Sequence, residues 1–399
     1  MEEWDIVIVG AGIAGVSAIR TLVAGGYNGK VLLINAERTV PYKRTKLSKH
    51  IADGSKAAQF ALEQPDWYEQ NNITLKSSTT VRHIDAGAHE FVLADGSRHS
   101  YKKMILATGA RPSYPKATTP ESADSLLVVR LERDIENLRK AVKHSKRVLV
   151  VGMGVLAVEV AAELRAMKKQ VTLAGATAQL MPRHLNPRTA EILEDLLRAR
   201  DIKLKFSEEV LKVEPRRKGG VSVTMLRDTL RFDAAVLCVG VKPDTALAED
   251  AGLEIGVGIR VNEQLQTSNP DIYAAGDCAE HADGSVTDLW HAAEYQGEIA
   301  AKNASGESVA YDGLLFRLKL EVFDNYFFSI NKPRDPLAVE IVESEIDKLY
   351  QCFFFEEGKL TGAIMVNDKD RAKEYQQAVR ESWEKQHVLE HFDRAPVID

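Results

Sequence analysis

The sequence predicts an α/β protein in which a unit of strands and helices occurs twice and a smaller α+β domain follows. Two related stretches predict the repeated unit: VIVGAGIAGVSAIR at 7–20 and VLVVGMGVLAVEVAAELR at 148–165. Each has an apolar β-branched run, closely spaced glycines and an alanine-rich helical stretch. The C-terminal stretch LYQCFFFEEGKLTGAIMV predicts a hairpin that turns at Glu357 and Gly358, with a charged helix from about Arg371.

Length and composition limit the class of protein. A chain of 399 residues, 45% hydrophobic and 28% charged, is expected to form two or three domains with sizeable cores. The net charge of -6 gives no signal for a nucleic-acid partner. The acidic start MEEW is unlike a signal peptide, and no run of about 18 apolar residues predicts a membrane span. We therefore expect a cytoplasmic protein without a membrane partner.

The cysteines exclude two kinds of site. Cys238, Cys278 and Cys352 are at least 40 residues apart, so the sequence has neither a CxxC redox pair nor the ligand spacing of a zinc site. We expect no bound metal.

The first repeat predicts a Rossmann-type dinucleotide site. DIVIVG is expected to be a buried parallel strand, and Gly10, Gly12 and Gly15 form the GxGxxG pattern. The three glycines permit the tight turn, the approach of a pyrophosphate and the packing of helix on strand. The following strand, KVLLINAE, is followed by Glu37, and Asn35 stands nearer the position of the usual ribose carboxylate.

The second repeat keeps the turn and lacks the acid. Gly152 and Gly154 are present, and Ala157 in the third position still permits close packing. The expected strand is QVTLAGATAQL, and the ribose carboxylate is expected near Gly175, but there is no acid, lysine or arginine between Gln170 and Pro182. This favours a modest preference for NADH over NADPH. The alternative is a decayed nucleotide site kept as scaffold.

Three further phrases support a family resemblance. MILATGARP at 104–112 and DIYAAGDCAE at 271–280 fit strands that end in a glycine turn, and WHAAEYQGEIAAKN at 290–303 fits a helix. With both glycine motifs, residues 1 to about 310 resemble the FAD-dependent pyridine nucleotide-disulfide oxidoreductases. The resemblance implies two three-layer Rossmann-like domains of the glutathione-reductase type. It implies an FAD-binding domain at 1–112 and 244–310, an NAD(P)H-binding domain at 113–243 and a C-terminal α+β domain at 311–399.

The resemblance also implies site residues. In the FAD domain, Gly10, Gly12 and Gly15 cradle the pyrophosphate, Asp277 meets the ribityl-pyrophosphate region and Arg111 lies against the cofactor. In the NAD(P)H domain, Glu159 stands near the nicotinamide and the flavin. The other positions implied to bind cofactor, beside those named in the repeats, are Ala14, Val81, Ala107, Thr108, Gly109, Gly240 and Gly276.

The segment TVPYKRTKLSKH distinguishes branches of this family. It contains no cysteine beside the expected flavin site, and a thiol relay needs a thiolate there. The pattern PY-R--LSK instead resembles the branch that reduces rubredoxins and ferredoxins, although Thr45 and Lys46 stand where two prolines are usual. That branch implies Arg44 at the FAD phosphates and Lys49 near the flavin ring, paired with Glu159. The alternative for Arg44 and Lys49 is a solvated basic face.

These observations lead to one function and several rivals. We expect an FAD-dependent enzyme that takes hydride from NADH and passes electrons singly to a rubredoxin- or ferredoxin-type iron protein, because a flavin can join a two-electron donor to a one-electron acceptor. The rivals are a flavin-only NADH oxidase that makes hydrogen peroxide, a redox-sensing or docking flavoprotein, and the flavin module of a larger reductase. The oligomeric state, monomer or homodimer, stays open.

One segment suggests where an acidic carrier binds. From Arg38 to Ala52 there is no acid, and the segment contains five basic residues: Arg38, Lys43, Arg44, Lys46 and Lys49. A basic patch on an acidic protein would steer an acidic iron-sulfur carrier toward it. The alternative is that most of this charge faces the FAD phosphates.

Overall fold

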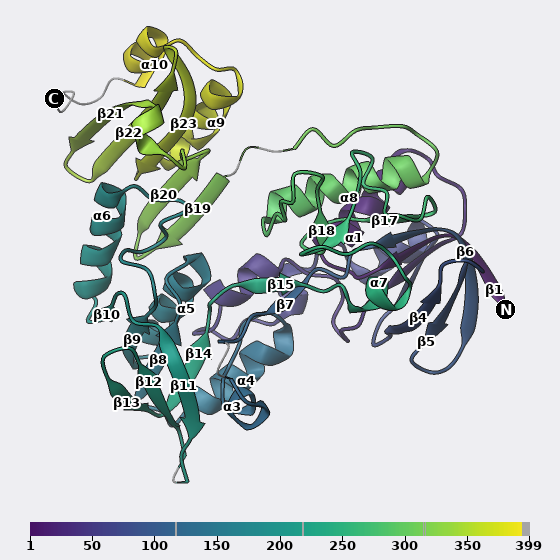
Figure 1. Ribbon diagram of the computed structural model, residues 1–399, viewed down its shortest axis with the longest axis horizontal. Helices are drawn as coiled ribbons and strands as arrows, with labels where there is room; N and C mark the ends of the chain where they lie inside the picture. The colour runs from purple at the N-terminus through teal and green to yellow at the C-terminus, as the bar shows by residue number, and fades with distance from the viewer. Residues whose placement is uncertain (116–117, 218, 314, 316, 393–399) are drawn as a thin grey trace. The chain divides into compact units, whose positions relative to one another are not determined.

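The computed structural model describes residues 1–115, 118–217, 219–313, 315 and 317–392 (Figure 1). Contacts divide the chain into two compact units. Unit 1 comprises Met1–Ser113, Arg130–Ile135 and Gly240–Gly313, and unit 2 comprises Tyr114–Val129, Glu136–Val239 and Leu314–Asp399. The residues that form the predicted C-terminal domain thus group with those of the predicted NAD(P)H-binding domain.

Unit 1 contains the first predicted strand, glycine turn and helix. Its main sheet has the order β3-β2-β1-β6-β5-β4, and β17 also pairs with β6. The strands of this sheet are β1 Glu2–Val9, β2 Val31–Ile34, β3 Ile73–Lys76, β4 Val81–Asp85, β5 Glu90–Leu93, β6 Arg98–Leu106 and β17 Ile272–Ala274. Strands β1, β2, β3, β6 and β17 are joined in parallel, whereas β4 and β5 extend the sheet in antiparallel fashion.

Two helices of unit 1 pack closely together. They are α1 Ile13–Ala24 and α8 Trp290–Ala304, and α8 was the helix predicted from WHAAEYQGEIAAKN. A Cβ at Gly297 would lie 2.1 Å from the carbonyl oxygen of Ala14, so the helices meet at a position where only glycine fits. The remaining elements of unit 1 are α2 Pro65–Gln70, α7 Ala246–Asp250, β7 Ala110–Pro112, β15 Val241–Pro243, β16 Ile259–Arg260, β18 Ala279–Glu280 and the 3-10 helices η1 Arg44–Lys49 and η2 Ala57–Phe60.

Unit 2 contains the second copy of the motif. Its parallel sheet has the order β10-β9-β8-β14. The chain between β10 and β14 forms a separate antiparallel sheet, β11-β12-β13. The predicted strand QVTLAGATAQL is shorter than expected, because β9 ends at Ala174 and the chain turns there. The elements are β8 Arg147–Val151, β9 Gln170–Ala174, β10 Lys203–Lys205, β11 Val210–Pro215, β12 Val221–Met225, β13 Thr229–Phe232, β14 Ala234–Leu237, α3 Pro120–Asp124, α5 Val155–Ala166 and α6 Pro187–Arg198; α4 Glu132–Val142 begins in unit 1 and ends in unit 2.

The C-terminal part of unit 2 is a five-stranded antiparallel sheet with helices. The predicted hairpin is confirmed: β22 Leu349–Glu356 pairs with β23 Lys359–Val366, and Glu357 and Gly358 have φ of 49° and 77°. Two consecutive positive φ angles are typical of the tight turns that suit a twisted hairpin. The other elements are β19 Arg317–Val322, β20 Asn325–Ile330, β21 Glu340–Ile346, η3 Pro336–Ala338, η4 Lys369–Arg371, α9 Ala372–Arg380 and α10 Lys385–Phe392.

An aromatic core holds this sheet to its helices. Phe353 of β22 stacks on Tyr375 of α9 with ring centroids 5.9 Å apart, and Phe392 of α10 lies 4.3 Å from Tyr375. Ion-pair hydrogen bonds join the same part of the chain to α6, where Arg188 binds Glu345 of β21 at 2.8 and 2.6 Å.

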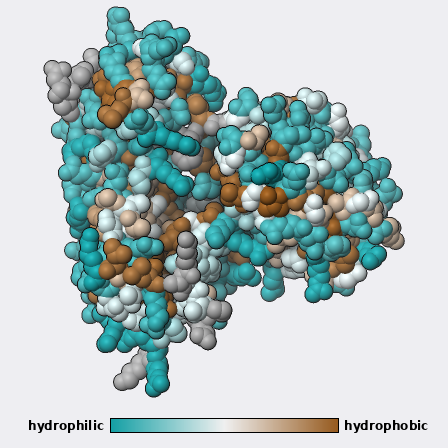
Figure 2. Space-filling view, in the orientation of Figure 1, coloured by the Kyte–Doolittle hydropathy of each residue, from teal (hydrophilic) through white to brown (hydrophobic). Residues whose placement is uncertain are grey.

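On the face drawn in Figure 2, hydrophilic residues predominate. Among the described residues, no helix is both long enough and apolar enough to cross a membrane.

Candidate functional site

The glycine turn between β1 and α1 has the geometry that the sequence predicts. Gly10 has φ of +111°, and a Cβ there would lie 2.2 Å from the carbonyl oxygen of Ala107 at the end of the neighbouring β6. A Cβ at Gly15 would lie 2.0 Å from the carbonyl oxygen of Gly10. Both positions therefore require glycine, the first for the turn and the second for the packing of helix on turn.

Gly12 differs because its surroundings are open. It is the N-cap of α1, where no side chain forms a capping hydrogen bond with the helix, and a Cβ there would meet nothing within 4 Å. The first N–H groups of a helix have no partner within the helix and attract an anion. The turn thus fits the pyrophosphate of a dinucleotide, which would occupy the space that Gly12 leaves.

The turn between β8 and α5 repeats this geometry in unit 2. Gly152 has φ of +135°, and a Cβ there would lie 2.2 Å from the carbonyl oxygen of Cys238 at the end of β14. Gly154 is the N-cap of α5 and has nothing within 4 Å of a Cβ, whereas Ala157 is fully buried. This equivalence argues against a decayed second site, because the open position at the helix N-terminus is kept.

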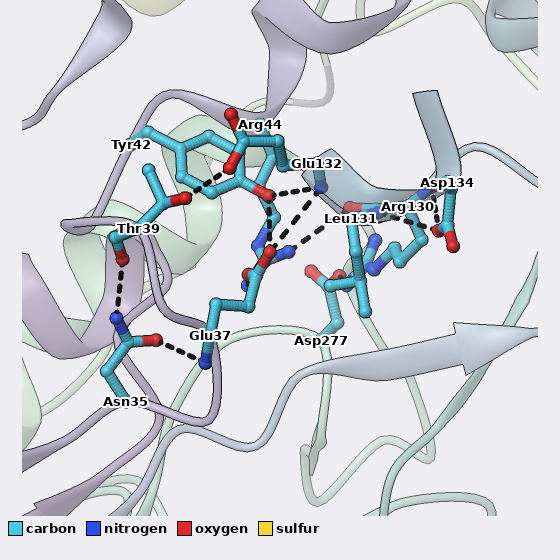
Figure 3. A network of polar contacts seen from close by, with 10 residues as sticks. All are labelled: Asn35, Glu37, Thr39, Tyr42, Arg44, Arg130, Leu131, Glu132, Asp134 and Asp277. Carbon is cyan, nitrogen blue, oxygen red and sulfur yellow. Dashed lines mark hydrogen bonds and ion pairs between the residues drawn. The ribbon is translucent and has the colours of Figure 1, made fainter. Parts of the chain in front are cut away.

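The loop after β2 contains two predicted residues, and both are hydrogen-bonded to other residues of the chain. Asn35 is buried; its Nδ2 donates to the carbonyl oxygen of Thr39 at 2.8 Å, and its Oδ1 accepts from the N–H of Glu37. The Glu37 carboxylate forms an ion pair with Arg44 at 2.8 Å and accepts from the Tyr42 hydroxyl at 2.9 Å (Figure 3). Burial raises the pKa of Tyr42 and keeps this hydroxyl protonated as a donor.

Arg130 is a residue of this region that the sequence analysis missed. Its Nη2 forms an ion pair with Asp277 Oδ2 at 2.8 Å, and its carbonyl oxygen accepts from Arg44 Nη1 at 3.1 Å. A Cβ at Gly109, which has φ of +73°, would lie 3.4 Å from Arg130 Nη2. No motif in the sequence marks Arg130, because its ion pair with Asp277 and its hydrogen bond with Arg44 join it to residues 147 and 86 positions away.

The other predicted positions of unit 1 lie at the ends of strands. Thr108 donates to the carbonyl oxygen of Asp244 at 2.7 Å, and the exposed Arg111 forms an ion pair with the Asp244 carboxylate at 2.7 Å. Gly276 has φ of +83°, and a Cβ there would lie 3.1 Å from that of Ala14. Val81 begins β4, and Gly240, with φ of +100°, accepts from the N–H of Ser113.

The two predicted catalytic residues belong to different units. Lys49 is half-buried at the end of η1 in unit 1, and Glu159 is buried on α5 in unit 2. Their pairing stays a prediction.

All three cysteines are buried and free. Burial raises the pKa of each thiol, that of Cys238 to about 12. Because the thiolate is the reactive form, these side chains have the character of packing residues. Among the described residues, no group of three or more histidine, cysteine, aspartate or glutamate side chains is arranged to hold a metal ion.

Comparisons with known proteins agree with this geometry. The model of the family "Pyridine nucleotide-disulphide oxidoreductase" matches residues 4–297, and "Rubredoxin NAD+ reductase C-terminal domain" matches residues 318–383. A rubredoxin-NAD(+) reductase of Ectopseudomonas oleovorans is 34% identical over 69% of this chain and 71% of its own length. An NADH-rubredoxin oxidoreductase of Clostridium acetobutylicum is 26% identical over 96% of each chain.

A solved structure shows the same fold. The chain is similar to the reductase in the crystal structure of a covalent putidaredoxin reductase-putidaredoxin complex, with a TM-score of 0.86 and 25% identity over 98% of this chain and 96% of that one. The likeness covers both glycine turns and the C-terminal sheet. The chain belongs to the FAD-dependent pyridine nucleotide-disulfide oxidoreductase family.

Proposed function

We propose that this enzyme takes hydride from NADH and passes electrons one at a time to a rubredoxin- or ferredoxin-type iron protein. The observation that carries the proposal is the similarity to the NADH-rubredoxin oxidoreductase of Clostridium acetobutylicum, which extends over 96% of both chains and so includes the C-terminal domain. The match of residues 318–383 to the C-terminal domain of rubredoxin reductases supports the same acceptor.

The FAD site is proposed in unit 1. The open N-terminus of α1 at Gly12 would hold the pyrophosphate, and the guanidinium groups of Arg44 and Arg130 would lie beside it. Asp277 would accept hydrogen bonds from the ribityl chain. Glu37 would accept hydrogen bonds from the ribose hydroxyls in place of one of its present partners. The proposed FAD domain comprises 1–112 and 244–310, and we include in it the short segment that contains Arg130 because this segment groups with unit 1.

The NADH site is proposed in unit 2, at the open N-terminus of α5 beside Gly154. The proposed NAD(P)H domain comprises 113–243, and 311–399 the C-terminal domain. FAD, when bound, supplies the change from two-electron to one-electron transfer. The chain contributes orientation and charge: Lys49 would place a positive charge near the flavin ring and Glu159 would orient Lys49.

The basic segment 38–49 is the proposed binding face for the acidic carrier. The structure separates its charges into two groups. Arg44 is ion-paired with Glu37, whereas Arg38, Lys43 and Lys46 are exposed. The exposed group is available to an acidic partner.

We also propose that the protein works in the cytoplasm.

Turnover under anaerobic conditions tests the proposal. With NADH and purified rubredoxin, we expect rapid reduction of rubredoxin that does not depend on oxygen. Peroxide formation in air with no rubredoxin reduction would instead support the flavin-only oxidase.

One observation favours a second candidate, the flavin module of a larger reductase. A nitrite reductase [NAD(P)H] of Bacillus subtilis is 30% identical over 92% of this chain, which spans only 46% of that protein. Co-purification with a second subunit that bears an iron centre, together with slow rubredoxin reduction, would favour this candidate.

A further inference from the structure

Five consecutive residues, Arg130–Asp134, form a strap across unit 1. The chain before them, Tyr114–Val129, and the chain after Ile135 belong to unit 2. Helix α4 therefore begins in the strap and ends in unit 2. The strap has its own cap, because the Asp134 carboxylate accepts from the N–H groups of Arg130 and Leu131 at 3.0 and 2.8 Å.

The strap contacts three of the residues that we assign to FAD binding (Figure 3). The Arg130 side chain binds Asp277 and its carbonyl oxygen accepts from Arg44. The N–H of Glu132 points to the Tyr42 hydroxyl at 3.0 Å and to Glu37 at 3.4 Å. The strap thus contacts the loop after β2, the start of η1 and the segment after β17.

The side chain of Glu132 fastens the strap to this loop. Its carboxylate accepts a hydrogen bond from the Thr39 hydroxyl and, through Oε1, one from the N–H of Ala57 at 3.0 Å. Thr39 stands between Glu37 and Arg44, and Ala57 begins η2. Hydrogen bonds to a carboxylate are stronger than those to a neutral acceptor, so Glu132 stabilises this contact more than a neutral side chain would.

We propose that Glu132 is a positioning residue that holds the strap on the loop 35–44 and thereby slows the release of FAD. The inference rests on the proposed FAD site in unit 1. Glu37 and Arg44 stand on a loop and a 3-10 helix, and such segments open locally at lower free energy than the core of a sheet. Two charge-assisted hydrogen bonds from a neighbouring helix raise the free energy of that opening.

The rate of FAD release tests the proposal. The full-length holoprotein is diluted, and the first-order rate constant of FAD dissociation is measured from the recovery of flavin fluorescence. For Glu132→Ala we expect an increase of about a hundredfold or more, which corresponds to the loss of two hydrogen bonds to a charged group. Glu136→Ala is the matched control, because Glu136 is an exposed glutamate one turn further along α4, in unit 2. It should release FAD at the wild-type rate.

A second variant separates positioning from general damage to the fold. Thr39→Val removes one of the two donors and should accelerate release by a smaller factor, and adding it to Glu132→Ala should have almost no further effect. The apoprotein melting temperature should hardly change. An unchanged release rate in both variants would overturn the proposal, and so would a fall in the melting temperature of the apoprotein as large as that of the holoprotein. A wild-type protein that binds no FAD would contradict the proposed function instead.

Discussion

Arg44 and Lys46 lie two residues apart on η1 and have different surroundings: Arg44 is half-buried in an ion pair with Glu37 at 2.8 Å, whereas Lys46 is exposed. The basic segment therefore contains a charge that is paired within the protein and a charge that is exposed to solvent.

This division predicts the effect of charge reversal on the carrier. Lys43→Glu combined with Lys46→Glu should lower the association rate constant with an acidic carrier by about tenfold or more at low ionic strength and weaken its salt dependence. Stopped-flow reduction of rubredoxin at several salt concentrations measures both quantities. The reduction of the flavin by NADH, followed in the same variant, should hardly change. If only the hydride step slowed, these lysines would belong to the cofactor site.

The open space at Gly12 predicts a variant that folds without its cofactor. Gly12→Asp places a carboxylate where the pyrophosphate should lie, and Gly12 has φ of −73°, which aspartate adopts without strain. We expect a folded apoprotein, recognised by a normal far-ultraviolet circular dichroism spectrum and the absence of flavin absorbance. A variant that purifies fully yellow would show that the first glycine turn is not the FAD site.

The cysteines are expected to be dispensable for electron transfer. Replacing Cys238, Cys278 and Cys352 with alanine should leave the rate of transfer from NADH to the carrier largely intact, because all three thiols are buried and protonated at neutral pH. Small cavities should cost about 1 kcal/mol of stability each. Loss of flavin-to-carrier transfer, with hydride transfer preserved, would reveal a thiol relay.

Gly175 is expected to set the preference between NADH and NADPH. The neutral groups nearby are engaged in the chain: the Thr177 hydroxyl donates to the carbonyl oxygen of Gln179, and the Gln179 amide donates to that of Leu185. We therefore expect weak NADH binding and a preference for NADH below about a hundredfold.

Gly175→Glu tests this expectation. The glycine does not have a positive φ. A Cβ there would lie 2.7 Å from Met153 Cγ, so the methionine side chain would have to shift to admit glutamate. We expect tighter NADH binding and a higher ratio of kcat/KM for NADH over NADPH. A strong NADPH preference in the unaltered enzyme would contradict the prediction and point to the exposed Arg183.

His184 predicts a pH dependence of stability. Burial, with Arg183 and Lys332 nearby, lowers its pKa from the ordinary 6.5 to about 4. The unfolded chain then binds a proton more readily than the folded chain, so stability falls as the pH falls below 6.5 and continues to fall to about 4. Between pH 7 and pH 5 the loss should be about 1–2 kcal/mol. His184→Gln should reduce this loss in urea unfolding, whereas His144→Gln, at an exposed position, should not.

Local patterns in the sequence were enough to predict the features that depend on neighbouring residues. Both glycine turns could be predicted because Gly10 and Gly152 meet steric demands of a strand-turn-helix unit that any sequence of this type must satisfy. The hairpin turn at Glu357 and Gly358 could be predicted because its conformation depends on two adjacent residues. Asn35 and Glu37 follow β2, as the sequence predicts, whereas their hydrogen-bond partners depend on how the loop after β2 folds.

The features that join distant parts of the chain could be recognised in the folded structure alone. Arg130 meets Asp277 across 147 positions, and Glu132 meets Thr39 across 93, so no local pattern marks either residue. The grouping of the C-terminal sheet with α6, through Arg188 and Glu345, is of the same kind. The structure also separated Arg44 from Lys46, which the sequence presents as equal members of one basic run. The physical reason is that ion pairing and burial depend on which segments meet in space, whereas turn geometry depends on the residues within the turn.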